Sequence, residues 1–229
     1  MARRILLIDC YLDDPGAGGT FAPLLTGAEV TVARAPREPV AVDPAAFDAV
    51  IISGSAASVV EPPSWAGPLE PLVRRAAAAA VPVLGVCFGH QIIARALWGR
   101  GAVRLSPTPE LGWLEITRTG ASDPLFDGVA ARFPVFCSHQ DEVVDLPAEA
   151  TVLATSGRCS VQSYRVSGRP IWAVQFHAEM SLAEASAVVD RKAELYPERA
   201  IDPAALRAAA VDTTDLARRL FDNFLAQRA

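Results

Sequence analysis

Short aliphatic runs alternate with helical patterns through the first hundred residues of the chain. Four runs are bounded by charged or turn residues, as expected of strands in a buried sheet: residues 5–8, 29–33, 49–53 and 81–86. Helices are predicted for residues 64–80 and 91–98, the second with Gly99 as its C-terminal cap. Because strand and helix alternate, we predict an α/β fold with a doubly wound, mostly parallel central sheet.

The second half carries mainly strand patterns joined by turns. They cover residues 113–118, 133–137, 151–154, 161–166 and 171–176, which indicates antiparallel additions to the parallel core. Helices are expected after the capping box of Ser181 and Glu184 and after the Asp202-Pro203 pair. A last amphipathic helix over residues 215–227 places four apolar residues on one face: Leu216, Leu220, Phe221 and Phe224.

The composition is that of one globular domain spanning residues 1–229. A hydrophobic content of 51% supplies a substantial core and excludes intrinsic disorder. The net charge of −5 leaves no basic footprint, so we expect no nucleic-acid partner. Basic residues are almost all Arg, with Lys192 as the only Lys, which we read as codon bias.

No segment is predicted to cross a membrane. The most apolar stretch, residues 76–89, is interrupted by Pro82 and Gly85, whereas a spanning helix needs about 20 apolar residues. The N-terminal apolar run, residues 5–8, is too short for a secretion signal. The four cysteines are widely spaced in a chain too large to need stapling, so we expect reduced thiols in a soluble cytoplasmic protein.

The most informative stretch surrounds Cys87, where a strand ends and a helix begins. Gly85 and Gly89 flank the cysteine in the pattern of a nucleophile elbow, with a thiol where serine is usual. Such a turn strains the central residue and projects its side chain out of the sheet, at a helix N-terminus that favours thiolate. The first helical amide, from Phe88, would then point toward an oxyanion. A buried structural cysteine in a Gly-rich turn would leave the same pattern.

A histidine at the end of a later strand favours the catalytic interpretation. The chain has only three His, and His177 follows an apolar strand, with Glu179 two residues beyond it. A carboxylate in that position can orient the imidazole ring while the other ring nitrogen faces the thiol. Together with the elbow, these residues predict a Cys87, His177 and Glu179 triad.

The combination resembles the class I glutamine amidotransferase family, and most closely the stand-alone members similar to the amidotransferase domain of GMP synthase. The resemblance rests on the sequence GVCFGHQ around Cys87 and QFHAE around His177. It continues, in the order of the family, through residues 51–55, 110–113, 123–126, 138–141 and 145–147. It implies a flavodoxin-like sheet and covers most of the chain.

The resemblance also implies a role for individual residues. Cys87 would be the nucleophile, His177 the general base and acid, and Glu179 the partner that orients His177. Gly54, Ser55 and Phe88 would supply backbone amides to the oxyanion. Bound substrate would be contacted by Gln91 and by the loop of residues 138–141, within which Ser138 and His139 are candidate substrate-binding residues. His139 could equally serve only to satisfy a carbonyl of this loop.

Three positions depart from the family pattern. The usual two glycines and proline after the third strand are replaced by Gly54, Ser55 and Ala56, which restricts a peptide flip. Ala178 replaces the usual proline between His177 and Glu179. Gln140 stands where glycine is common in the GMP synthase type, a change that bears on which γ-glutamyl compound is accepted.

Other chemical interpretations are weaker. Cys87 with His90, and Cys137 with His139, have spacings seen in metal sites, but no second tight pair completes a zinc site, so we expect no metal and no cofactor. The glycines at 16, 18 and 19 fail the spacing of a dinucleotide-binding loop, and we interpret them as a surface turn.

The expected activity is hydrolysis of a γ-glutamyl amide, through a γ-glutamyl thioester on Cys87. Glutamine would release ammonia for a separate synthetase or ligase subunit. Hydrolysis of γ-glutamyl peptides is an alternative that uses the same chemistry. A third possibility is a non-catalytic subunit that keeps the fold for regulation or assembly, with which the departures at Ser55 and Gln140 would be compatible.

Overall fold

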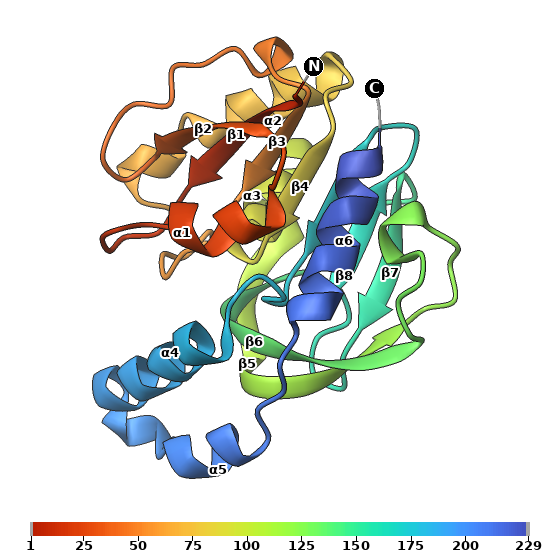
Figure 1. Cartoon of the computed structure of the whole chain (residues 1–229). Coiled ribbons are helices and arrows are strands. Elements are labelled where there is room, and N and C mark those ends of the chain that lie inside the picture. The colour runs from red at the N-terminus through yellow and green to blue at the C-terminus, as the bar shows by residue number, and fades with distance from the viewer. Residues whose placement is uncertain (1, 228–229) are drawn as a thin grey trace.

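The computed structural model describes residues 2–227 and is organised around one nine-stranded sheet (Figure 1). The sheet has the order β2-β1-β3-β4-β9-β8-β7-β5-β6. Its parallel part consists of β1 (Arg4–Asp9), β2 (Glu29–Arg34), β3 (Ala49–Ile52), β4 (Val83–Val86) and β9 (Ile171–Val174). Its antiparallel part consists of β5 (Val103–Arg118), β6 (Arg132–Val143), β7 (Ala150–Thr155) and β8 (Ser163–Val166). The predicted mostly parallel sheet with antiparallel additions is therefore confirmed.

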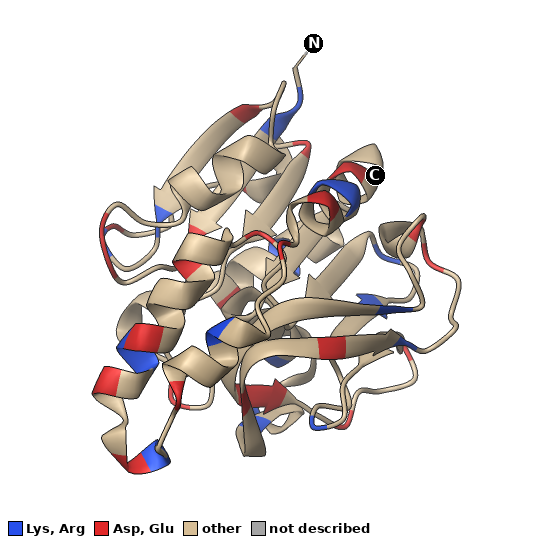
Figure 2. Cartoon of the chain, turned by 60° about the horizontal axis from the view of Figure 1, so that its bottom comes forward, with Lys and Arg blue, Asp and Glu red and all other residues tan. Residues whose placement is uncertain are grey.

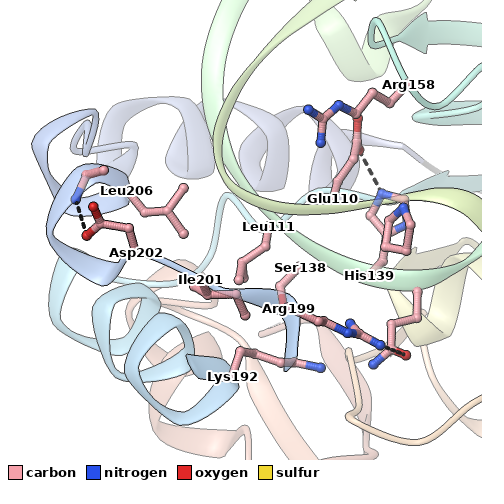
Figure 3. A pocket seen from close by; sticks show the side chains of 13 residues that line it. Glu110, Leu111, Ser138, His139, Arg158, Lys192, Arg199, Ile201, Asp202 and Leu206 are labelled. Atoms are coloured by element: carbon pink, nitrogen blue, oxygen red, sulfur yellow. Dashed lines mark hydrogen bonds and ion pairs between the residues drawn. The ribbon is translucent and has the colours of Figure 1, made fainter. Parts of the chain in front are cut away.

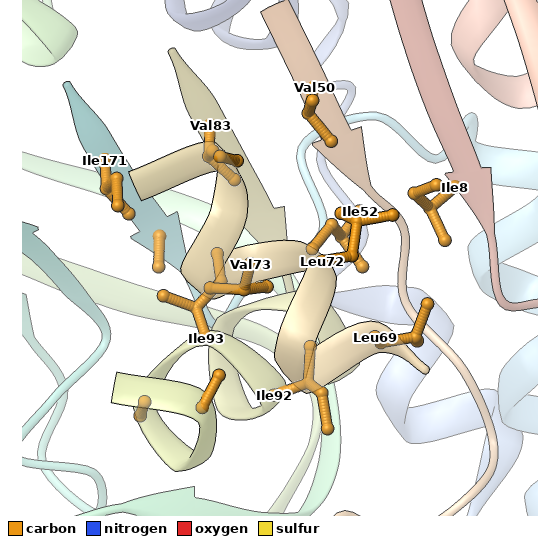
Figure 4. Packing of buried hydrophobic residues seen from close by; sticks show 14 of the residues in the cluster. Ile8, Val50, Ile52, Leu69, Leu72, Val73, Val83, Ile92, Ile93 and Ile171 are labelled. Atoms are coloured by element: carbon orange, nitrogen blue, oxygen red, sulfur yellow. The ribbon is translucent and has the colours of Figure 1, made fainter. Parts of the chain in front are cut away.

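Alternate residues of the parallel strands enter two separate cores. Leu6 and Ile8 of β1 and Val50 of β3 lie in one cluster, under α2 (Leu69–Ala78) and α3 (Phe88–Trp98) (Figure 4). Ile5 and Leu7 lie in the other cluster, with α1 (Gly18–Phe21) and α6 (Thr214–Ala226). Because successive strand side chains point to opposite faces, a continuous aliphatic run is what a strand covered on both faces requires.

The segment between β9 and α6 packs on the long antiparallel hairpin. It contains α4 (Leu182–Leu195) and α5 (Pro203–Ala208), which lie together beside β5 and β6 (Figure 1). Ala185 and Val189 of α4 join a third apolar cluster with Trp113 and Phe136. The expected caps are present, since Ser181 and Glu184 form a capping box and the Asp202 side chain accepts two amides of α5.

Several predicted boundaries are wrong. The helix expected at residues 64–80 is a 3₁₀ turn, Ser64–Ala66, followed by α2, because Pro68 forces a new start. The predicted strands at residues 113–118 and 133–137 are parts of the much longer β5 and β6. Residues 138–141 are therefore not a loop but the continuation of β6, where His139 pairs with Glu110 of β5.

The glycines after β1 do not form the simple surface turn that was expected, because they lead into a helical turn that packs against the protein. Gly16 has a φ of 88°, and a Cβ atom there would lie 2.1 Å from a carboxylate oxygen of Asp9. One helical turn, α1, then begins at Gly18 and buries Thr20 and Phe21. The Thr20 hydroxyl donates to Glu184, 2.5 Å away, so this segment is joined to the start of α4.

The charge distribution of the surface is mixed. Acidic and basic residues are interspersed over the face shown in Figure 2, including on the helices of the segment after β9. Among residues 2–227, no helix has the length and apolar character needed to cross a membrane.

Candidate active site

The predicted site residues gather at the carboxyl ends of parallel strands. Cys87 directly follows β4, His177 follows β9, and Gly54 follows β3. Adjacent parallel strands end at the same edge of the sheet, which is where open α/β sheets bind ligands. The neighbouring strands β4 and β9 thus bring together residues that are 90 positions apart in the sequence.

Cys87 occupies the strained backbone position predicted for an elbow. Its φ of 51° and ψ of −100° lie outside the regions that favour a non-glycine residue. A Cβ atom on Gly85 would lie 2.5 Å from the backbone of Gly89, and one on Gly89 would lie 2.2 Å from the carbonyl oxygen of Ile52. Both glycines are therefore required by close backbone contacts, one within the turn and one with β3.

His177 lies between a carboxylate and the thiol of Cys87. Its Nδ1 is 2.7 Å from Oε1 of Glu179, and the Glu179 side chain is only 1% exposed. Burial alone would lower the pKa of His177, but the charge of Glu179, with that of Cys87 and the hydrogen bonds to both, raises it to about 10. The backbone of His177 is held by β6, since its amide donates to the carbonyl of Phe136 at 2.8 Å.

The lack of a side chain at Gly54 lets the ring of His177 lie beside Cys87. A Cβ atom on Gly54 would lie 2.8 Å from Cε1 of His177 and 3.5 Å from Cβ of Cys87. Any side chain at this position would displace the imidazole ring, so the glycine is needed for space. Ser55 follows without a left-handed backbone angle, and its hydroxyl accepts the amide of Ala57 at 3.1 Å. Phe88 is the first residue of α3, whose first-turn amides have no partner within the helix.

Gln91 and Asp141 line a cavity with Cys87 that His177 does not line. Nε2 of Gln91 donates to the carbonyl of Asp141 at 2.9 Å and to the side chain of Gln175 at 3.0 Å. The carboxylate of Asp141 accepts the hydroxyl of Ser58 at 2.7 Å and the amide of Val59 at 2.6 Å. Its Oδ1 atom is buried without a partner in the described structure. Asp141 thus anchors the loop after β3 and keeps one carboxylate oxygen unused.

Ser138 and His139 are placed differently from one another. The carbonyl of Ser138 is 3.8 Å from Sγ of Cys87. His139 lies beside the same cavity, but Nδ1 faces the carbonyl of Asp141 at 2.9 Å and Nε2 faces Glu110 at 2.7 Å. Both ring nitrogens of His139 are thus engaged within the protein, which leaves neither of them free for a substrate in this structure.

Glu110 completes a buried polar network with His139. Its side chain is 1% exposed and accepts from His139, Ser156 and Gln162. Burial raises the pKa of Glu110, but these donors, led by His139, lower it overall. The network is a structural support of the site, and the strand pattern alone did not identify it.

The departure at Gln140 has a structural explanation. Its side chain lies 3.4 Å from the hydroxyl of Tyr196 and accepts from Arg199 at 3.2 Å. A glycine could not make these contacts, which join β6 to the segment after α4. Ala178 is buried in an apolar cluster, and its carbonyl accepts the hydroxyl of Thr213 at 3.3 Å.

Three cavities meet around the site. The Cys87 cavity, of about 220 Å³, is lined by Cys87, Gln91, Asp141 and residues of the loop after β3. The His177 cavity, of about 190 Å³, is lined by His177, Tyr11, Leu12, Met180 and Val188, among others. The α5 cavity, of about 570 Å³, lies between the β5–β6 hairpin and α4–α5 (Figure 3). Ser138 and Lys192 line all three.

Two residues at these cavities were not predicted from the sequence. Lys192 points into the α5 cavity (Figure 3), and its ammonium lies 5.3 Å from the ring centre of Tyr196. Tyr11 follows β1, the same kind of strand end that pointed to Gly54 and Cys87, so position relative to the strands could have identified it. Lys192 had no such signal beyond being the only lysine.

The remaining cysteines and His90 belong to the interior. Burial raises the pKa of Cys10, Cys137 and Cys159, the last to about 12. His90 is buried on α3 beside the ring of Tyr164, with ring centres 4.8 Å apart. Within residues 2–227, no group of three His, Cys, Asp or Glu side chains could hold a metal ion.

Relatives of this chain include subunits of a known synthase. Two matched relatives are subunits of glutamine-hydrolysing GMP synthases. That of Methanothermobacter thermautotrophicus is 40% identical over 100 residues, covering 44% of this chain and 52% of the relative. That of Saccharolobus solfataricus is 38% identical over 138 residues, covering 60% and 70%. The chain thus spans about half the length of the first of these relatives.

Solved structures extend the similarity of fold to the whole chain. A glutamine amidotransferase from Thermotoga maritima has a TM-score of 0.81 at 22% identity, covering 98% of this chain and 97% of that one. A glutamine amidotransferase from Methylobacillus flagellatus has a TM-score of 0.79 at 22% identity, covering 100% and 97%. The family model for class I glutamine amidotransferases matches residues 24–193, which is well over half of the sequence. The chain therefore belongs to the class I glutamine amidotransferase family.

Proposed function

We propose that Cys87, His177 and Glu179 form a catalytic triad that hydrolyses the γ-carboxamide of glutamine. The observation that carries the proposal is the imidazole of His177, hydrogen-bonded to buried Glu179 and packed with Cys87 around Gly54. A strained thiol at a helix N-terminus, a histidine and an orienting carboxylate are the three parts that nucleophilic catalysis of acyl transfer needs.

In the first half of the reaction, the sulfur of Cys87 attacks the γ-carbonyl carbon of glutamine. The carbonyl electrons move onto oxygen, and the oxyanion accepts hydrogen bonds from the amides of Phe88 and of the Gly54–Ser55 loop. The carbon–nitrogen bond then breaks. His177, held in its protonated form by Glu179, donates the proton that turns the leaving nitrogen into ammonia.

In the second half, His177 removes a proton from water. The resulting hydroxide attacks the γ-glutamyl thioester, and the sulfur of Cys87 leaves. Glutamate is released and the thiol is regenerated, so that each cycle consumes one glutamine and one water. Glu179 stabilises the imidazolium in both halves without itself accepting the proton.

The Cys87 cavity is suited to the amino-acid end of glutamine. The unpaired Oδ1 of Asp141 provides a negative charge for the α-ammonium group, and Gln91 lines the same wall. Burying an ammonium group is costly unless a carboxylate pairs with it, and a buried carboxylate oxygen without a donor is likewise costly. Bound glutamine would satisfy both.

The ammonia acceptor is proposed from the relatives. They are named as subunits of a glutamine-hydrolysing GMP synthase, which supports a separate synthetase partner that receives ammonia from this chain. No cofactor is needed for the hydrolysis itself.

The test is glutamate release from glutamine by the purified chain, with and without a candidate synthetase subunit. Wild type is compared with Cys87→Ala and with Cys159→Ala, a buried cysteine away from the triad. We expect activity in wild type and Cys159→Ala, and a loss of at least about 10³-fold in Cys87→Ala. Equal activity of Cys87→Ala and wild type would exclude the proposed nucleophile.

A further inference from the structure

The α5 cavity has no part in the hydrolysis proposed above, although it is the largest of the three cavities around the site. Its volume is about 570 Å³, which is typical of pockets that bind small molecules. It adjoins the Cys87 cavity, and the two share Ser138, Gln140 and Lys192. Neither Cys87 nor His177 lines it. The side chains of its own walls therefore determine what it can bind.

One wall of this cavity lies beyond the part of the chain that the family model matches. The match ends at residue 193. Arg199, Ile201 and Leu206, which line the cavity, all follow that point. The cavity is therefore formed in part by a segment that the family match does not include, and the shared chemistry of the family does not explain it.

Three basic side chains line the α5 cavity. Figure 3 shows Lys192 and Arg199 on one side of it and Arg158 on the opposite side. Among residues 2–227, Arg158 and Lys192 have no carboxylate within 4.0 Å, and Arg199 reaches only the exposed Glu198, at 3.8 Å. Because the whole chain has a net charge of −5, this local excess of positive charge favours an anionic ligand.

The two acidic residues of the cavity are already engaged within the protein. The buried carboxylate of Glu110 accepts from the three side chains of its own network. The carboxylate of Asp202 accepts the amides of Ala204 and Ala205, at 3.0 and 3.1 Å, where it caps α5. The basic groups are therefore the charged groups that remain available to a ligand.

The ring of Tyr196 holds two of the basic side chains in place. The ammonium of Lys192 lies 5.3 Å from the centre of this ring, and the guanidinium carbon of Arg199 lies 4.2 Å from it. Arg199 also donates to the side chain of Gln140 at 3.2 Å. Ordering long side chains opposes binding, so side chains that are already held by a ring and a hydrogen bond bind an anion at a smaller entropic cost.

The same cavity has an apolar part. Leu111 of β5, Ile201 and Leu206 of α5 line it, and Figure 3 shows them between the basic groups and the outer turn of α5. An inorganic anion would leave these side chains in water, whereas a hydrocarbon group attached to the anion would cover them. The combination of basic and apolar side chains fits an anion that carries a hydrocarbon group.

We infer that the α5 cavity is a binding site for a small organic anion. Its carboxylate or phosphate group pairs with Lys192 and Arg199, and its hydrocarbon part packs on Leu111, Ile201 and Leu206. Arg158 adds positive charge from the opposite side. The site is separate from the triad, and the inference holds whether or not the chain hydrolyses glutamine.

The experiment is calorimetric titration of the wild-type chain with hexyl phosphate, hexanoate, methyl phosphate and hexylammonium. We expect at least one hexyl anion to bind with a Kd of about 1 mM or lower, and the tighter of the two identifies the preferred anionic group. Methyl phosphate, which lacks most of the hydrocarbon, should bind at least about tenfold more weakly than hexyl phosphate. No binding of either hexyl anion at about 10 mM, or equal binding of hexylammonium, would overturn the inference.

Variants test whether the ligand occupies this cavity. Ala205→Trp fills it, and affinity for the tighter hexyl anion should fall about tenfold or more, whereas Ala204→Trp, at an exposed position of α5 that does not line the cavity, should leave it unchanged. Lys192→Met should also weaken binding about tenfold, with Arg169→Met at an exposed position as the control.

Urea midpoints equal to that of the wild type show that the variants are folded, and Lys192→Met provides the test if Ala205→Trp is not. Unchanged affinity in folded Ala205→Trp would show that the ligand binds elsewhere. Unchanged affinity in Lys192→Met would overturn the pairing of the anion with the ammonium group.

Discussion

The amide of Cys87 donates a 2.8 Å hydrogen bond to the carbonyl of Val174, so the strand that ends in the predicted nucleophile is joined to the strand that leads to His177. Three residues after Val174, the imidazole reaches the space beside Cys87 that Gly54 leaves open. The geometry of the site is thus a consequence of parallel pairing between β4 and β9.

The glycines of the elbow should be intolerant of any side chain. Gly89→Ala would place a Cβ atom 2.2 Å from the carbonyl oxygen of Ile52, and backbone cannot move away as a flexible side chain could. We expect a loss of about 1–3 kcal/mol in the free energy of unfolding, measured by urea denaturation. Gly101→Ala is the control, since its Cβ would meet no atom within 4 Å, and its stability should change by less than about 0.5 kcal/mol. Equal stability of the two variants would contradict the close contact.

The interaction of His177 with Glu179 should make stability depend on pH. The folded-state pKa of His177 is raised from 6.5 to about 10, so protonated His177 contributes stability that is complete below pH 6.5 and is lost as the pH rises through 10. Glu179→Gln removes the charge and should destabilise the protein more at pH 6 than at pH 10.5. Urea midpoints across this range provide the measurement, with Glu194→Gln on exposed α4 as the control. Parallel pH profiles for wild type and Glu179→Gln would show that the raised pKa is not due to Glu179.

The buried pair of Glu110 and His139 should matter far more than a surface pair on the same strands. Glu110→Ala leaves the His139 ring and two further donors without their acceptor, and we expect a loss of about 3–5 kcal/mol in the free energy of unfolding. Glu115→Ala removes an exposed pair with Arg132 and should cost less than about 1 kcal/mol. Similar losses for both variants would contradict the buried network.

Asp141 should control the mobility of the loop after β3. Its carboxylate accepts the amides of Val59 and Val60 at 2.6 and 3.2 Å. In Asp141→Ala, hydrogen exchange at these amides should accelerate by about tenfold or more, while exchange in β1 stays slow. If glutamine also binds Asp141, the KM for glutamine should rise in the same variant. Unchanged exchange at Val59 and Val60 would show that other contacts hold the loop.

Many of the helices and strands can be predicted from patterns among residues that are close in the sequence. The aliphatic runs of β1, β3 and β4 and the capping box of α4 depend on neighbouring residues, and their predicted positions agree with the structure within a few residues. The extension of β6 through residues 138–141 could not be predicted this way. These residues are polar. They are extended because β5 pairs with them, because His139 binds Glu110 of β5, and because Asp141 binds the loop after β3.

The candidate site likewise contains residues that local sequence predicts and residues that it does not. Gly85, Cys87 and Gly89 lie within five residues of one another, and the strain of the turn is a local property, so their arrangement was predictable. Lys192 lies at the site only because distant elements form the cavities around it, whereas the position of Tyr11 just after β1 is a local signal. Composition alone favours codon usage as the reason for a single lysine, and it gives no sign of the cavities that Lys192 lines.

The most direct test of the central claim is the site at which a glutamine-mimicking diazoketone labels the protein, determined by mass spectrometry of its peptides. If Cys87 is the nucleophile of a γ-glutamyl amide hydrolase, one equivalent of label should be found on Cys87, excess glutamine should slow its attachment, and His177→Ala should slow it further. Label on Cys10, Cys137 or Cys159 in its place, or no label on folded protein, would contradict the proposed triad.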